Sequence, residues 1–205
     1  MAEISIYEEE ISEFFLERHQ FKIKGWLQYA YSVHANGEDY VNRNKDLLLQ
    51  FLIHQNKYPL FLTFRDDFDE FSTFLNENKI EYTLNVLQDN NMGHYFTAKI
   101  QDPDTLALLL NETYWLASIN NFYCISFSNN LAFDLVKVKA WIMVINESIP
   151  TFKMNAGSTF ITTNHDGDGF CLFSNEEKYD SLDSFLKSLP KELIITYLNG
   201  DPVNE

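Results

Sequence analysis

Between Tyr58 and Asn129 the spacing of apolar residues switches back and forth between the period of a strand and that of a helix, which constrains the fold more than any other feature. The run Leu60 to Phe64 is rich in strand-forming residues. Asp66 or Asp67 then offers a side-chain oxygen to the unpaired N–H groups of a first helical turn. The helix that follows is expected to bury one apolar face, made of Phe68, Phe71, Phe74 and Leu75.

The rest of this segment continues the alternation. Apolar residues alternate with polar ones from Ile80 to Val86, and a partner strand is expected from Tyr95 to Ile100. Asp102-Pro103 then pairs a helix N-cap with a proline at the first helical position, where its missing N–H costs no hydrogen bond. A last strand is expected from Phe122 to Phe127. The order strand–helix–strand–strand–helix–strand predicts a ferredoxin-like, split βαβ centre over residues 58–129.

The flanking segments add to this centre on both sides. Residues 1–57 are predicted to be mainly helical, with helices over 6–18 and 39–55 and a strand over 26–33 between them. Residues 130–198 form a β-rich unit that ends in a strand–helix–strand, with strands expected over 140–145, 157–163, 170–173 and 193–198. Its helix face, Tyr179, Leu182, Phe185 and Leu186, has the same spacing as the face at 68–75, which leaves an internal duplication open. The tail 199–205 has no apolar face and is expected to fray.

Together these patterns predict an α/β (α+β) protein with a mixed or antiparallel sheet, folded as a single compact domain over residues 1–205. The first residues lack a basic region followed by an apolar run, and no stretch is long enough to cross a membrane, so we expect a cytoplasmic protein. Cys124 and Cys171 sit between apolar neighbours and are interpreted as buried, reduced thiols.

The charge balance restricts the partners. The net charge is −15, from 30 acidic and 15 basic side chains, whereas binding to phosphate backbones needs a basic surface. Nucleic acid and anionic membranes are therefore excluded as expected partners, and a basic protein is favoured, although acidity also serves solubility alone. The candidate docking residues lie in two acidic stretches, which as helix starts would also suit the helix dipole: Glu8, Glu9 and Glu10, and Asp66, Asp67, Asp69 and Glu70.

The polar run from Asn164 to Gly169 is the strongest chemical signal. Asn164, Asp166 and Asp168 occupy positions 1, 3 and 5 of a calcium loop, but its closing position holds Asn175, with Glu176 one residue late. A cation site formed by Asn164, Asp166, Asp168 and Glu176 is one hypothesis. The favoured interpretation is a hairpin turn, in which glycines supply positive φ angles and the aspartates bond their own backbone.

His165 beside Asp166 and Asp168 is also a candidate general base oriented by a carboxylate. The sequence contains no phosphate-binding glycine loop and no G-x-S-x-G elbow, and no cofactor is expected. Two functions are therefore carried forward. The first is an acidic binding module that neutralises a basic protein, of the immunity, antitoxin or anti-defence kind. The second is an enzyme or cation-dependent protein that uses the loop His165-Asp166-Gly167-Asp168.

Overall fold

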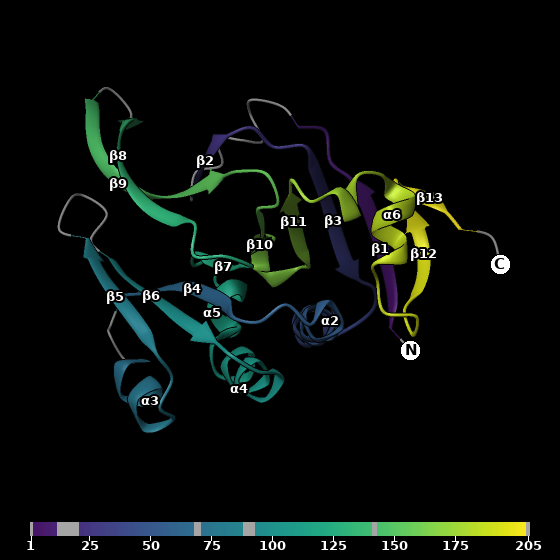
Figure 1. Ribbon diagram of the computed structural model, residues 1–205, viewed down its shortest axis with the longest axis horizontal. Helices are drawn as coiled ribbons and strands as arrows, with labels where there is room; N and C mark the ends of the chain where they lie inside the picture. Colours follow the sequence, from purple (N-terminus) through teal and green to yellow (C-terminus); the bar gives the residue numbers. More distant parts are fainter. Residues whose placement is uncertain (1, 12–20, 68–70, 88–92, 141–142, 204–205) are drawn as a thin grey trace.

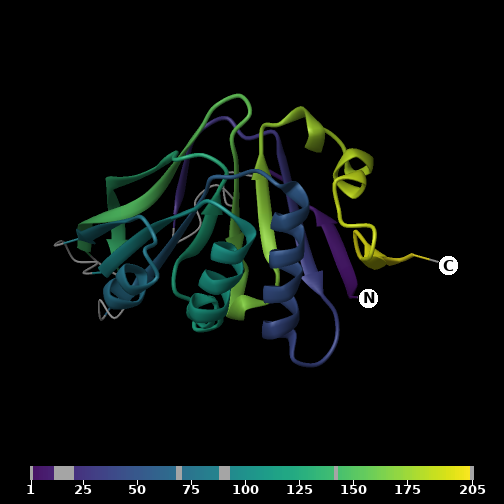
Figure 2. The ribbon, with the colours of Figure 1, turned by 60° about the horizontal axis from the view of Figure 1, so that its bottom comes forward.

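The computed structural model describes residues 2–11, 21–67, 71–87, 93–140 and 143–203 (Figures 1 and 2). A ten-stranded sheet has the order β13-β12-β1-β3-β11-β10-β7-β4-β6-β5. Its strands are β1 Glu3–Glu8, β3 Tyr29–Ala35, β4 Leu60–Asp66, β5 Tyr82–Leu87, β6 Gly93–Ile100, β7 Tyr123–Ser126, β10 Thr159–Thr163, β11 Phe170–Ser174, β12 Ile194–Leu198 and β13 Asp201–Pro202. A three-stranded sheet has the order β2-β9-β8, with β2 Lys22–Gly25, β8 Leu131–Ala140 and β9 Met143–Met154. The helices are α2 Tyr40–Gln55, α3 Phe71–Glu77, α4 Pro103–Thr113, α5 Trp115–Ser118 and α6 Leu182–Lys187, with 3₁₀ turns η1 His165–Gly167 and η2 Glu177–Tyr179.

The ferredoxin-like centre is confirmed. The elements β4, α3, β5, β6, α4 and β7 occur in that order, with the short helix α5 between α4 and β7, and their strands lie side by side as β7-β4-β6-β5. Every neighbouring pair of these strands is antiparallel. The predicted cap is present, since Asp102 accepts a hydrogen bond from the backbone N–H of Thr105 at 2.8 Å and Pro103 begins α4. The fold is α+β with a mixed sheet, as the sequence predicts.

The N-terminal part differs from the prediction. Residues 3–8 form the strand β1, where the start of a helix over 6–18 was expected; residues 12–20 lie outside the described part of the chain. Ile4 and Ile6 alternate with more polar neighbours, and this period of two buries both isoleucines in the core. β1 is held between β3, antiparallel, and β12, parallel, so strands from opposite ends of the sequence stabilise it. The expected helix over 39–55 is confirmed as α2.

The C-terminal strand–helix–strand is confirmed as β11-α6-β12. This crossover passes over two strands, β3 and β1, whereas β4-α3-β5 passes over β6 alone, so the two units differ in topology. The expected strand over 140–145 is wrong, because Ala140 ends β8 and Met143 begins β9, and these residues pair across the two strands. The tail is partly ordered, since β13 pairs with the end of β12.

Two hydrophobic cores lie on opposite faces of the large sheet. Apolar residues of each described helix pack against one face, among them Phe51, Leu110 and Phe185. The other face, around Phe160, packs against the small sheet through side chains such as Phe152. Both cysteines are buried and neither forms a disulfide, as expected. Among the described residues no helix combines the length and apolarity needed to cross a membrane.

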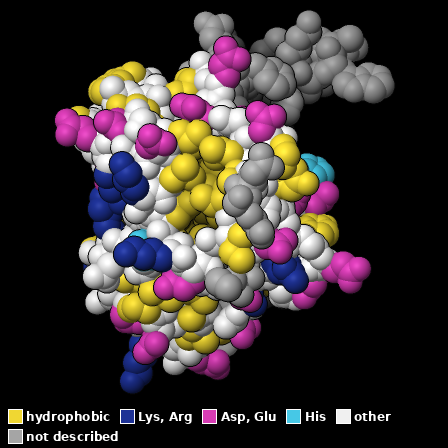
Figure 3. Space-filling view, turned by 90° about the vertical axis from the view of Figure 1, so that its right-hand side faces the viewer, with side chains coloured by type: hydrophobic (Ala, Val, Ile, Leu, Met, Phe, Trp, Pro, Cys, Tyr) yellow, Lys and Arg dark blue, Asp and Glu magenta, His cyan; other side chains and the backbone are white. Residues whose placement is uncertain are grey.

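The outer strand β12 leaves apolar side chains at the surface. β13 pairs with Tyr197 and Leu198, and the backbone N–H of Val203 donates to the carbonyl oxygen of Thr196, so among the described residues no strand pairs with Ile194 or Ile195 on that side. Ile194 and Tyr197 are 41% and 45% exposed, and Val203, which follows β13, is 46% exposed. Figure 3 faces the side of the molecule that carries α6, β12 and β13, and it shows hydrophobic side chains gathered in a hollow bordered by acidic ones.

Candidate functional site

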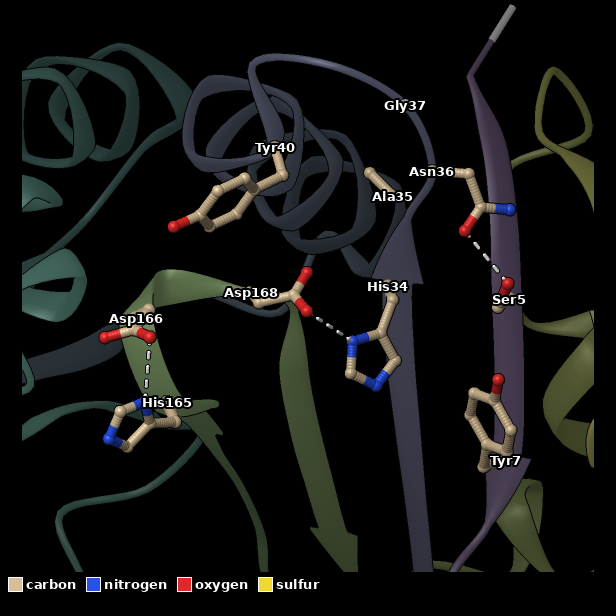
Figure 4. Close-up of a pocket in the computed structure, with 10 residues that line it drawn as sticks. All are labelled: Ser5, Tyr7, His34, Ala35, Asn36, Gly37, Tyr40, His165, Asp166 and Asp168. Atoms are coloured by element: carbon tan, nitrogen blue, oxygen red, sulfur yellow. Dashed lines mark hydrogen bonds and ion pairs between the residues drawn. The ribbon is translucent and has the colours of Figure 1, made fainter.

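A polar pocket of about 820 Å³ opens where β1, the connection from β3 to α2 and the loop between β10 and β11 meet (Figure 4). The strand register explains why these segments converge. Ala35 at the end of β3 lies opposite Ile4 of β1, and Val33 lies opposite Phe170 at the start of β11. The pocket is lined by Ser5, Tyr7, His34, Ala35, Asn36, Gly37, Tyr40, His165, Asp166 and Asp168.

Asp168 occupies the centre of the pocket in Figure 4, between Tyr40 and His34. Its Oδ2 lies 3.8 Å from Nδ1 of His34, and its Oδ1 accepts a hydrogen bond from Nδ2 of Asn44 at 3.3 Å. Asn44 is fully buried, and its own Oδ1 accepts from the backbone N–H of Ala35 at 2.7 Å. The buried side chain of Asn44 therefore links the Asp168 carboxylate to the end of β3. Asp168 is already restrained, so it would lose less conformational entropy on binding a ligand.

His34 is held in place from two sides. Tyr7 of β1 meets the His34 ring edge to face, with ring centroids 5.8 Å apart. Nε2 of His34 lies 3.4 Å from Nδ2 of Asn164. On the other side stands Gly169, with φ +88°, where an added Cβ would lie 2.3 Å from the Val33 carbonyl oxygen and 2.9 Å from Nδ1 of His34. Only a glycine lets the loop approach β3 this closely.

Asp166 is fixed by Asn120, the residue that follows α5 and Ile119. Asn120 donates from Nδ2 to Oδ1 of Asp166 at 2.8 Å, and the backbone N–H of Asp166 donates back to Oδ1 of Asn120 at 2.7 Å. The hydrogen bond from Asn120, followed by that from His165, lowers the pKa of the Asp166 carboxyl below its ordinary value. Asp166 therefore carries a full negative charge at neutral pH.

The loop is also anchored from beneath by Tyr114, whose hydroxyl donates to the carbonyl oxygen of Gly167 at 3.1 Å. Burial raises the pKa of Tyr114, and the nearby charge of Asp168 adds to the effect. The tyrosine thus stays a neutral hydrogen-bond donor.

The loop from Asn164 to Gly169 joins two antiparallel strands, as the hairpin interpretation predicts. Gly167 and Gly169 have the expected positive φ angles, and Asp166 shares this conformation at φ 59°. The expected bonding of the aspartates is wrong in detail. Asp166 and Asp168 bond to side chains of other elements rather than to their own backbone, because α2 and the end of α5 lie against the loop.

The structure does not bring the four predicted cation ligands together. Glu176 lies at the opposite end of β11 from the loop, where it pairs with Lys57 and accepts a hydrogen bond from Oγ1 of Thr159 at 2.6 Å. Asn164 turns its Oδ1 toward Sγ of Cys171, at 2.9 Å. Within the described part of the chain, no group of three or more His, Cys, Asp or Glu side chains is arranged to hold a metal ion.

The two predicted acidic docking stretches do not form one surface. Glu8 ends β1 and Asp66 ends β4. The antiparallel pairings of the strands that lie between them make β1 and β4 run in opposite directions, so these two strand ends lie at opposite ends of the sheet's strands. The two strands are also five strand spacings apart, roughly 24 Å. Asp66 is buried, and Asp67 forms an ion pair with Arg65 at 2.8 Å. Glu9 accepts a hydrogen bond from Ser32, Glu10 is exposed, and Asp69 and Glu70 lie outside the described residues.

Of the predicted catalytic residues, His165 is the least supported, since its side chain is 81% exposed. His34 is the histidine that lies beside Asp168, with its Nδ1 3.8 Å from Oδ2, and sequence reasoning missed it together with Tyr7 and Tyr40. A weak signal was present, because His34 follows Ala30 and Ser32 on one face of its strand, two residues before the Asn36-Gly37 turn. That spacing indicates that the His34 side chain points away from the core covered by the helices, but it does not indicate which residues surround the side chain.

The pocket therefore combines two carboxylates, two imidazoles and two phenol rings, and none of the described residues lining it is a lysine or arginine. Such a lining suits a cationic group, which carboxylates attract and aromatic faces stabilise. Comparison with protein-family models, with curated proteins and with solved structures found no match for this chain.

Proposed function

We propose that this protein is an acidic protein-binding module that neutralises a basic partner, in the manner of an immunity, antitoxin or anti-defence inhibitor. The pocket around Asp168 receives a cationic side chain of that partner, most suitably the guanidinium group of an arginine. One observation carries this proposal: Asp166 and Asp168 share a pocket with Tyr7 and Tyr40, and the described residues that line it include no lysine or arginine.

Arginine fits this lining better than lysine for a geometric reason. A guanidinium group is planar, donates in a fixed fork to a carboxylate and stacks on aromatic rings, whereas an ammonium group is a compact, strongly hydrated charge. Asp168 is held by Asn44 and Asp166 by Asn120 before any ligand arrives. Acceptors that are already in position lose little conformational entropy on binding, so the pair contributes more affinity than mobile surface carboxylates would.

The surface beside the pocket extends this interface. Trp115 and Ile119, at the two ends of α5, are 48% and 56% exposed. The 165–167 turn packs against α5, with the Cβ position of Gly167 lying 3.4 Å from Ser118, so these apolar side chains belong to the same region as Asp166. Exposed tryptophan is characteristic of binding hot spots. The net charge of −15 would in addition speed the approach of a basic partner at low ionic strength.

Replacing Asp168 with asparagine should weaken the binding of a fluorescein-labelled, arginine-rich peptide about tenfold, since it removes one charged acceptor from the pocket. Fluorescence anisotropy at low and moderate salt measures this affinity. Asp183→Asn is the matched control, because Asp183 is an exposed residue of α6 and the substitution changes net charge equally. Equal weakening by both variants would mean that the affinity depends only on the net charge of the protein, and it would contradict binding of the peptide in the pocket.

A second candidate function rests on the pairing of His34 with Asp168. An imidazole oriented by a carboxylate at the wall of a pocket can act as a general base toward water. In this version His34 takes the part that the sequence assigned to His165. Hydrolysis of the ester p-nitrophenyl acetate should then fall at least tenfold in His34→Gln and stay unchanged in His54→Gln, where the exposed histidine lies on α2. Identical rates for both variants would eliminate the enzymatic alternative.

A further inference from the structure

A second polar cluster lies at the other end of β11, where Lys57 and Lys178 meet around Glu176. The Glu176 side chain is only 12% exposed and forms an ion pair with Lys57, while Nζ of Lys178 lies 3.9 Å from its Oε2. Both lysine nitrogens also lie 5.9 Å from the centre of the Phe127 ring. Glu176 already accepts a hydrogen bond from Thr159. One carboxylate thus serves two ammonium groups, which leaves the cluster with an unbalanced positive charge.

Lys178 is the more confined of the two lysines. Its Nζ donates to Oε1 of Gln55 at 2.7 Å and stands 4.4 Å from the centre of the Tyr179 ring. The hydroxyl of Tyr179 donates to the same Gln55 oxygen at 3.0 Å. The amine is therefore partly withdrawn from bulk water, and the side chain as a whole keeps an exposed fraction of 34%.

These surroundings disfavour the charged form of the amine. Burial, followed by the positive charge of Lys57, lowers the pKa of Lys178 to about 8, while the charge of Glu176 opposes the shift. Roughly a quarter of an amine with that pKa is neutral near pH 7.5, against roughly one thousandth of an unperturbed lysine. A neutral amine is the nucleophilic form.

We propose that Lys178 is a covalent modification site, at which its amine takes the acyl group of small acyl phosphates without help from another enzyme. The amine lone pair attacks the acyl carbon, the bond between that carbon and the phosphate oxygen breaks, and phosphate leaves with its electron pair. The amine proton passes to solvent and an amide remains, so no oxidant or reductant is required. Lys57 supplies the neighbouring positive charge that attracts the phosphate end of the donor.

The test is acetylation of the folded protein by acetyl phosphate near pH 7.5, followed over time by mass spectrometry of its peptides. Lys99 is the matched control, because its side chain has the same exposed fraction of 34% but pairs with one carboxylate, Glu81, at 2.9 Å. We expect Lys178 to react at least tenfold faster than Lys99. The rate at Lys178 should also level off above about pH 8, in line with the pKa lowered by burial and by Lys57.

Two further measurements test whether the reactivity of Lys178 depends on the folded cluster rather than on the residues next to it in the sequence. Lys57→Gln, shown by its melting curve to be folded, should lower the rate at Lys178 at least threefold, because it removes the neighbouring positive charge while the burial of the amine remains. In urea the preference for Lys178 should vanish. Equal rates at the two lysines in the folded wild-type protein, or a preference that persists in urea, would overturn the proposal.

Discussion

Replacing Phe160 with alanine should lower the free energy of unfolding by about 4 kcal/mol. Phe160 is fully buried between the large and the small sheet. Its ring stacks on Phe152 with centroids 3.7 Å apart and on Phe173 at 4.7 Å, while Phe21 meets it edge to face at 5.9 Å. Removing the ring loses apolar burial and leaves a cavity among aromatic neighbours that cannot collapse freely.

Urea unfolding followed by circular dichroism measures this loss. Phe160→Leu is the comparison, because it keeps most of the volume and should cost about 1.5 kcal/mol. We also expect Phe160→Ala to make β8 and β9, residues 131–154, more sensitive to limited proteolysis, since Phe152 of β9 loses its stacking partner. If the alanine variant were as stable as the leucine variant, the small sheet would be held by contacts other than this stack.

Gly169→Ala should destabilise the protein by about 4 kcal/mol and abolish binding of the fluorescein-labelled, arginine-rich peptide at the pocket. The added Cβ would lie 2.3 Å from the Val33 carbonyl oxygen, an atom of the backbone that cannot rotate away. Either the loop or β3 must move, which costs packing and strand hydrogen bonds. Because the same Cβ would lie 2.9 Å from Nδ1 of His34, the displacement also separates His34 from Asp168.

Gly200→Ala is a close control for this prediction. Gly200 has the same φ of +88°, but nothing lies within 4 Å of its Cβ position. It therefore isolates the backbone strain of an alanine at positive φ, about 1 kcal/mol, from the steric overlap. Thermal and urea unfolding of both variants measure the difference. Equal destabilisation would show that the loop can withdraw from β3 at no cost, and that Gly169 does not position the pocket.

The two proposed sites lie at opposite ends of β11 and have opposite charge. The loop before β11 brings Asp166 and Asp168 into a pocket whose described lining residues include no lysine or arginine. The segment after β11 brings Lys178 to Lys57 around one shared carboxylate. Lys57 precedes β4 and Lys178 follows β11, so the basic cluster is assembled from separate segments of the chain. Binding of a cationic group and acylation of an amine therefore test independent regions.

Much of the fold followed from local patterns. The centre from β4 to β7 was predictable because the apolar residues of each element repeat with the period of a strand or of a helix. The N-cap Asp102, which accepts a hydrogen bond from Thr105, marks the start of α4 by a contact between residues close in sequence. The first strand was not predictable in this way. The residues from Ile6 onward suggested a helix, but pairing of β1 with β12 and β3 decided the outcome, and β12 lies at the other end of the chain.

The sequence by itself determined the strand and helix order of the centre, the burial of both cysteines and the turn with its two aspartates. Only the tertiary structure decided what those aspartates meet. Asp168 lies 124 residues from Asn44, and Asp166 lies 46 residues from Asn120. These contacts depend on strand register and helix placement, which arise from packing across the whole sheet and leave no local periodicity to detect. For the same reason His34 and Lys178 became candidate functional residues only once their neighbours were known.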